Sequence, residues 1–138
     1  MERVLFDTNI ILDVALKRMP HFELASELFE MIDRNKVTGH VTASTITDIY
    51  YISKKQKGHK SAIAFISSLI EILDVIGVDK ETIINALRMD LKDFEDSIQV
   101  SAAQYYKLDC IITRNKADFE QSYLKVFTPK EYLFHIRG

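Results

Sequence analysis

The sequence predicts an α/β domain with three layers, in which helices cover both faces of a central, mostly parallel sheet. Short apolar runs of strand length alternate with longer segments whose apolar residues recur at helical spacing. This alternation is typical of a parallel sheet that is buried on both faces. The chain has 138 residues, 47% of them hydrophobic, and only four glycines and two prolines. We therefore expect one domain over residues 1–138.

The first half of the chain predicts two strands and four helices. The strands are "RVLF" at 3–6 and "KVTGHVTA" at 36–43. The helices are expected over 10–18, 22–35, 44–55 and 59–73. The second of these shows the helical spacing most clearly, since its apolar stripe consists of Phe22, Ala25, Leu28, Phe29 and Ile32.

The second half continues the alternation. A short strand over 73–78 is followed by a helix over 79–89, with Asp79 as its N-cap, and by a helix rich in small residues over 93–107. The run "DCIIT" at 109–113 predicts a compact buried strand, and 114–122 a turn or short helix. Residues 124–136 predict a last strand, a turn at Thr128–Pro129 and a closing helix.

Charge and composition exclude several classes of protein. A net charge of −2 and a pI near 6.1 argue against coating of nucleic acid by bulk charge, although an enzyme with a local basic patch or bound metal ions stays compatible. Cys110 is the only cysteine, so we expect a buried, reduced thiol and no internal disulfide. No segment resembles a membrane span or a secretory signal, so we expect a cytoplasmic protein.

Polar side chains gather where three predicted strands end and where one helix begins. In open α/β sheets, ligands bind outside the carboxyl ends of the strands, so these groups could converge on one edge. The groups are Asp7-Thr8-Asn9 after the first strand, Thr42-Ala43-Ser44 with Asp48 after the second, Asp93, Glu95 and Asp96 at the start of the small-residue helix, and Thr113-Arg114-Asn115 with Asp118 after the strand at 109–113.

Each acid also has a purely structural interpretation. Negative side chains are favoured at helix N-termini as caps and in the first turn, which alone could explain Asp7, Asp48, Asp93 and Asp118. Asp96 differs, because it shares a stripe with Val100 and Ala103 that faces the interior or a site. Glu95 is expected to point elsewhere and to be solvated.

A cluster of carboxylates favours a divalent cation. Crowded like charges disfavour mutual ionisation, and a cation removes that cost. Oxygen ligands favour Mg²⁺ or Mn²⁺, and such an ion suits phosphoryl chemistry because it activates water and stabilises negative charge on the phosphate. Zinc is disfavoured because no His/Cys pair has suitable spacing; the histidines, expected at the surface or as caps, are His21, His40, His59 and His135.

Taken together, the segments resemble the PIN domain family, metal-dependent ribonucleases that include the VapC-type toxins of toxin–antitoxin pairs. "VLFDTNIILD" is similar to the opening strand with its first acid, here Asp7. "TASTITDIYYI" is similar to the segment with the second acid, usually Glu and here Asp48. "DFEDSIQVSAAQYYKLDCIITRNKADF" resembles the stretch with the third and fourth acids, and "VFTPKEYL" the usual end. The third acid is Asp96; many members have Asp at the position of Asn115, whereas Asp118 matches an alternative position.

The resemblance implies an endoribonuclease. Asp7, Asp48, Asp96 and Asp118 would hold one or two Mg²⁺ or Mn²⁺ ions, while the side chains expected to orient ligands or contact substrate are Asn9, Thr113, Arg114 and Asn115. For Arg114 the interpretation as a candidate phosphate contact competes with that of an ordinary surface arginine, which is favoured. RNA and a cognate antitoxin would be the partners. The apolar helix at 62–73 could form a homodimer or antitoxin surface, although packing in the core of a monomer is the default interpretation.

Two other functions stay open. A catalytically weak PIN-like domain could act as an interaction module, since Asp48 and Asn115 depart from the family pattern. Another Mg²⁺-dependent phosphoryl-transfer protein fits poorly, because an aspartyl phosphatase would have Asp-x-Asp where this chain has Asn9.

Overall fold

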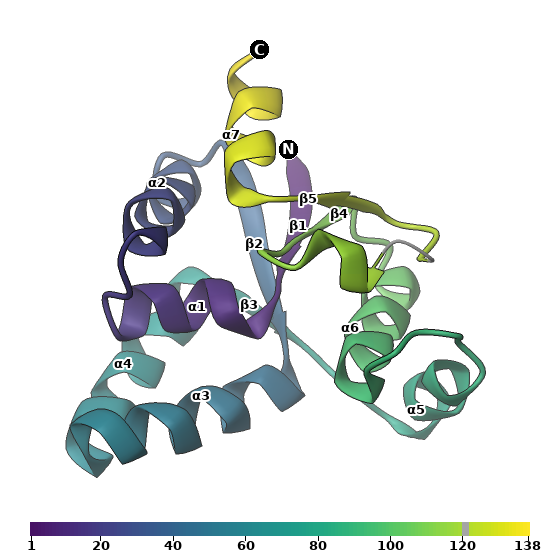
Figure 1. The fold of residues 1–138 in the computed structure, drawn as a ribbon, viewed down its shortest axis with the longest axis horizontal. Coiled ribbons are helices and arrows are strands. Elements are labelled where there is room, and N and C mark those ends of the chain that lie inside the picture. Colours follow the sequence, from purple (N-terminus) through teal and green to yellow (C-terminus); the bar gives the residue numbers. More distant parts are fainter. Residues whose placement is uncertain (120–121) are drawn as a thin grey trace.

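A computed structural model describes residues 1–119 and 122–138 of the chain (Figure 1). Five parallel strands form one sheet in the order β3-β2-β1-β4-β5. The strands are β1 (Glu2–Phe6), β2 (Val37–Thr42), β3 (Asp74–Ile76), β4 (Cys110–Ile112) and β5 (Lys125–Phe127). Every predicted strand is present, so the predicted parallel sheet is confirmed.

The predicted helices are present as well. They are α1 (Thr8–Ala15), α2 (His21–Asp33), α3 (Ala43–Lys57), α4 (His59–Ile72), α5 (Lys80–Leu87), α6 (Phe94–Tyr105) and α7 (Pro129–Arg137). The segment predicted as a turn or short helix contains the 3-10 helix η1 (Lys116–Phe119), and its residues 120 and 121 lie outside the described residues. None of the helices in the described part of the chain is long and apolar enough to cross a bilayer.

The predicted turn at Thr128–Pro129 is the start of α7. Thr128 is the N-cap, and Pro129 occupies the first turn, where its missing N–H costs nothing. The Glu131 backbone N–H donates to the Thr128 hydroxyl over 3.2 Å, and the Thr128 N–H donates to the Glu131 carboxylate over 2.9 Å. This reciprocal capping box begins the helix without a separate turn.

Helices cover both faces of the sheet and complete the three layers (Figure 1). Alternate residues of β1 enter different cores, since side chains of a strand point to opposite faces. Val4 and Phe6 pack with α1, α2, α3, α4 and α7, whereas Leu5 packs with α6. Burial of the central strand on both sides explains why it reads as a continuous apolar run.

The predicted environment is right for Cys110 and wrong for His40, two residues inside the sheet. Cys110 is buried, as predicted, and burial raises the pKa of its thiol to about 12. His40 was expected at the surface or as a cap, and that prediction is wrong: it is buried in β2 with its Nδ1 3.1 Å from the Val4 carbonyl oxygen. The reason is that β2 lies inside the sheet, between β1 and β3.

The strand order places the site. The chain leaves β1 for β2 and β3 on one side and then crosses to β4 on the other side of β1. The carboxyl ends of β1 and β4 are therefore neighbours whose following segments diverge, and such a switch point opens a crevice in α/β sheets. The Asp7 backbone N–H donates to the Ile112 carbonyl oxygen over 3.0 Å and links the two ends.

Candidate active-site cleft

A cleft of about 430 Å³ opens at this switch point. Six of its lining side chains are carboxylates, and Lys92 is the only basic side chain among the described residues that line it. The lining residues come from α1, α3, η1, the start of α6 and the segments just before α1, α6 and η1: Asp7, Thr8, Asn9, Leu12, Asp48, Ile52, Lys92, Asp93, Glu95, Asp96, Asn115 and Asp118.

The structure thus brings all four proposed metal-binding acids to one cleft. Asp7, Asp48, Asp96 and Asp118 line it together with Asn9 and Asn115, and Thr113 lies just behind Asp7. Arg114 is absent from the lining. These acids meet at the carboxyl ends of the parallel strands, as predicted, although they are separated by up to 111 positions in the chain.

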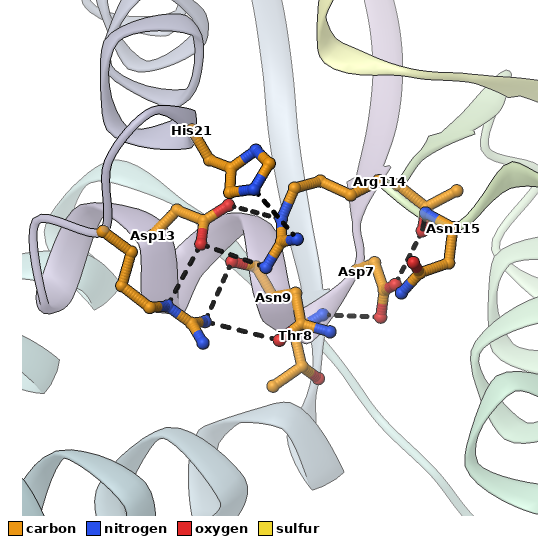
Figure 2. A network of polar contacts seen from close by, with 9 residues as sticks. Asp7, Thr8, Asn9, Asp13, His21, Arg114 and Asn115 are labelled. Carbon is orange, nitrogen blue, oxygen red and sulfur yellow. Dashed lines mark hydrogen bonds and ion pairs between the residues drawn. The ribbon is translucent and has the colours of Figure 1, made fainter.

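Asp7 is held by three donors. Its Oδ1 accepts from the Thr8 backbone N–H over 2.8 Å and from the Gln99 side-chain amide over 3.1 Å. Its Oδ2 accepts from the Thr113 hydroxyl over 2.7 Å. Asp7 is also the N-cap of α1, so capping and a position in the cleft are compatible roles of one carboxylate (Figure 2).

Thr113 connects Asp7 to the loop after β4. Its side chain is fully buried, and its hydroxyl donates to Asp7 while it accepts the Asn115 backbone N–H over 3.0 Å. The Asn115 side chain reaches the cleft from this loop, and Asp118 reaches it from η1. This segment therefore presents one neutral and one acidic side chain to the cleft.

Asp96 lies in the first turn of α6. The helix begins at Asp93, whose carboxylate accepts the Asp96 backbone N–H over 3.1 Å, so the capping interpretation of Asp93 is confirmed. Burial, followed by the negative charges of Asp7, Asp93 and Asp118, raises the pKa of the Asp96 carboxyl to about 7. The site therefore opposes the negative charge of Asp96 even though a helix N-terminus favours it.

Glu95 faces the cleft, so the prediction that it is solvated elsewhere is wrong. Hydrogen-bonding contact with Asp48, partial burial and the charge of Asp48 together raise the pKa of the Glu95 carboxyl to about 8. The Thr8 hydroxyl donates to Glu95 over 3.3 Å. Its place in the first turn of α6, next to Asp96, does not by itself distinguish a side chain in the cleft from a solvated one.

Arg114 was considered as a substrate contact and as a surface arginine, and in the structure it lies against Asp13 and His21. Its Nε donates to Asp13 Oδ2 over 2.8 Å, its Nη2 donates to Asp13 Oδ1 over 3.3 Å, and its Nη1 lies 3.3 Å from His21 Nε2. Figure 2 shows the guanidinium between Asp13 and His21, away from Asp7. Two guanidinium N–H groups of Arg114 thus bind the fully buried Asp13.

Arg18 approaches the same aspartate. Its Nε lies 3.1 Å from Asp13 Oδ1, an ion pair without hydrogen-bond geometry, and its Nη2 donates to the Asn9 side-chain oxygen over 3.3 Å. Asp13 was not among the predicted site residues. Its signal was a charged residue inside the apolar run "IILDVAL", a position that requires a partner because burial of a lone charge is costly.

The donor set fits a hard divalent cation. Its ligands would be oxygens of Asp7, Asp48, Asp96 and Asp118, which favour Mg²⁺ or Mn²⁺. Within residues 1–119 and 122–138, no three His, Cys, Asp or Glu side chains converge closely enough to form a ready-made metal cluster. Mg²⁺ retains several of its waters and uses few carboxylates directly, so acids spread around an open cleft suit it.

Comparison with known proteins identifies the family. The PIN domain model matches residues 3–117, most of the chain. This chain belongs to the PIN domain family. The match includes Asp7, Asp48 and Asp96 and stops one residue before Asp118. No curated protein matches the sequence.

Solved structures share the PIN fold. A toxin–antitoxin complex from Klebsiella pneumoniae is 24% identical, with 91% of this chain and 97% of that one covered and a TM-score of 0.69. DNA-bound VapBC from Salmonella typhimurium is 18% identical, with 94% and 99% covered and a TM-score of 0.72. VapC20 from Mycobacterium tuberculosis, a sarcin–ricin loop cleaving toxin, is 11% identical, with 78% and 86% covered and a TM-score of 0.63. These likenesses confirm the predicted three-layer fold.

Proposed function

We propose that this PIN domain is an endoribonuclease that needs Mg²⁺ or Mn²⁺ to hydrolyse RNA phosphodiester bonds. The observation that carries the proposal is the cleft at the switch point, whose lining combines six carboxylates with one lysine. PIN nucleases generally use divalent metals, which supports the same assignment. When bound, the ion activates water and stabilises negative charge on the phosphate.

The residues of the chain take distinct roles in this proposal. Asp7, Asp48, Asp96 and Asp118 would hold the cation or cations, and Thr113 orients Asp7 through its hydroxyl. Asp48 is one methylene shorter than the Glu typical of the family, so it would reach the cation through a water.

Lys92 is better placed than Arg114 to contact the RNA phosphate. Lys92 lines the cleft, whereas the guanidinium of Arg114 is committed to Asp13 and His21. Asn9 and Asn115 present amide groups at the cleft that hydrogen-bond to substrate or to ordered water.

We also propose that the domain is the toxin of a toxin–antitoxin pair in the cytoplasm. The complexes from Klebsiella and Salmonella support an antitoxin partner, and the sarcin–ricin loop cleaving toxin supports RNA as substrate. The outer face of α4 supports a homodimer, because it exposes Ile63 and Ile70, which lie two helical turns apart on one side.

Cleavage of a panel of structured and single-stranded RNAs, with Mn²⁺ or with EDTA, tests the enzyme. Wild type should cleave only with the metal. Asp7→Asn and Asp96→Asn should each lose at least about 100-fold, since each removes a charged ligand. The exposed Asp33, outside the cleft, provides the control substitution Asp33→Asn, which should cleave like wild type.

The same assay separates Asn115 from Asp118. Asp118→Asn should lose more activity than Asn115→Ala, because only the former removes a charge. Cleavage that persists in EDTA, or full activity of Asp7→Asn, would contradict the mechanism. A wild-type protein that neither cleaves the panel nor binds Mn²⁺ in calorimetry would instead support the interaction module.

A further inference from the structure

We propose that Gln99 is a positioning residue for the metal site: its side-chain amide fixes Asp7 so that the carboxylate binds a cation through a single oxygen, Oδ2. The inference rests on the proposed function and deepens it. Its basis is a contact between α6 and the end of β1 that links residues 92 positions apart.

Gln99 is an unusual residue for its place. It is 1% exposed, on the inner face of α6 beside the buried Val100, Ala102 and Ala103. Its Nε2 donates to Asp7 over 3.1 Å, but its Oε1 finds no hydrogen-bond partner among the described residues. A buried carbonyl without a hydrogen-bond partner destabilises the folded state. An apolar side chain would avoid that cost, so the retained amide indicates a role at Asp7.

The donors around Asp7 restrict how it can bind a cation. A carboxylate has about four acceptor positions, two on each oxygen. Oδ1 already accepts from Thr8 and Gln99, whereas Oδ2 accepts only from Thr113. Within the described residues, the spare acceptor position is therefore on Oδ2. This arrangement selects a one-oxygen ligand, which suits the octahedral geometry of Mg²⁺ better than a chelating carboxylate.

The neutrality of the donor is part of the inference. An arginine in place of Gln99 would hold the carboxylate equally firmly, but it would also cancel the charge that attracts a cation. The amide, the threonine hydroxyl and the backbone N–H orient Asp7 and leave its full negative charge to the cleft. Residues that orient metal ligands in this way typically change metal affinity 10–100-fold when they are mutated.

Calorimetric titration of metal-free protein with Mn²⁺ tests the proposal without any use of activity. Gln99→Met keeps the size of the side chain and removes the donor, and it should weaken Mn²⁺ binding at least about tenfold. Gln99→Asn keeps an amide that is one methylene too short, and it should show a similar loss. Gln104→Met is the matched control, because Gln104 lies on the same helix and faces away from the cleft.

A kinetic readout separates positioning from a purely structural role. Raising the Mn²⁺ concentration should restore kcat of Gln99→Met to within about threefold of wild type, while KM for RNA stays unchanged. A general disturbance of the fold would not be reversed by metal. Mn²⁺ affinity within twofold of wild type in both Gln99 variants would overturn the inference.

The two proposals can fail separately. If wild type neither binds Mn²⁺ nor cleaves RNA, the proposed function fails, and the role of Gln99 at a metal fails with it. If wild type does both and the Gln99 variants bind Mn²⁺ normally, only the inference fails. If Gln99→Met does not fold, Gln99→Asn decides alone, because it retains a polar side chain of smaller volume at the same place.

Discussion

Helix α1 has a buried aspartate near each end, and the two have opposite surroundings. Asp13 is fully buried and meets two guanidinium groups, those of Arg114 and Arg18. Asp7 is 6% exposed, and its hydrogen bonds come from neutral donors. It also lies close enough to Asp96 to raise the pKa of that carboxyl. The charge of Asp13 is therefore neutralised by arginines, whereas the charge of Asp7 has no cationic partner among the described residues.

The difference indicates a structural role for Asp13 and a functional role for Asp7. A buried charge with paired partners holds elements together, and its loss is expected to lower stability. Carboxylates that crowd together without cations lower stability while they stay ionised, so such a cluster indicates a task for which charge is needed. Removal of a cationic partner of Asp13 should therefore lower stability, whereas removal of an acidic neighbour of Asp7 should raise it.

The largest expected effect comes from Arg114. Arg114→Met should lower the free energy of unfolding by about 3 kcal/mol, because it leaves the buried Asp13 with only the poorly aligned Arg18. Urea denaturation followed by circular dichroism measures this change.

Lys116, two residues after Arg114, provides the control substitution. Lys116→Met removes an ion pair to Glu131 whose side chains are both about half exposed, and it should cost less than about 1 kcal/mol. Equal losses in the two variants would mean that the Asp13 ion pair is no more important than a surface pair.

Near Asp7, at the N-terminal end of α1, removal of the negative charge of Asp96 should stabilise the metal-free protein. In EDTA at pH 8, Asp96→Asn should raise the free energy of unfolding by about 1 kcal/mol, because it relieves burial and repulsion that raise the pKa of Asp96. The same urea experiment measures it, with Asp33→Asn as the control for loss of an exposed acid.

This variant should also lose RNA cleavage, so stability and activity would move in opposite directions. A destabilised Asp96→Asn protein in EDTA would show that the carboxylate contributes to the fold, and the contrast between the two ends of α1 would then be lost.

The sequence could predict those features that depend on local patterns or on the general topology of parallel sheets. The elements follow from local patterns, such as the alternation of Val4, Leu5 and Phe6 between two faces or the capping box of α7. The convergence of acids followed from the rule that parallel strands end at one edge of a sheet. Asp7 and Asp96 could be found because both lie at the ends of predicted elements.

The partners of these acids could not be predicted. Arg114 meets Asp13 across 101 positions, and Gln99 meets Asp7 across 92, so neither contact has a local signature. Glu95 was misassigned because the first turn of a helix is usually solvated, whereas here it faces Asp48. His40 was misassigned because a polar residue in a strand gives no sign that both faces are covered.

The smallest expected effect distinguishes the two arginines at the balanced end of α1. Arg18→Met should lower the free energy of unfolding by about 0.5 kcal/mol, measured as for Arg114→Met. Its side chain is 35% exposed, so part of its charge is already hydrated, and its buried Nε has no hydrogen-bond partner among the described residues. Removal of that unsatisfied donor offsets part of the lost attraction to Asp13.

A loss from Arg18→Met as large as that from Arg114→Met would mean that total positive charge balances Asp13, whatever its geometry. A small loss would show that the two-pronged hydrogen bonds of Arg114 carry the interaction. Donor geometry would then decide the outcome at both ends of α1: a charged fork neutralises Asp13, and neutral donors leave Asp7 available to a cation.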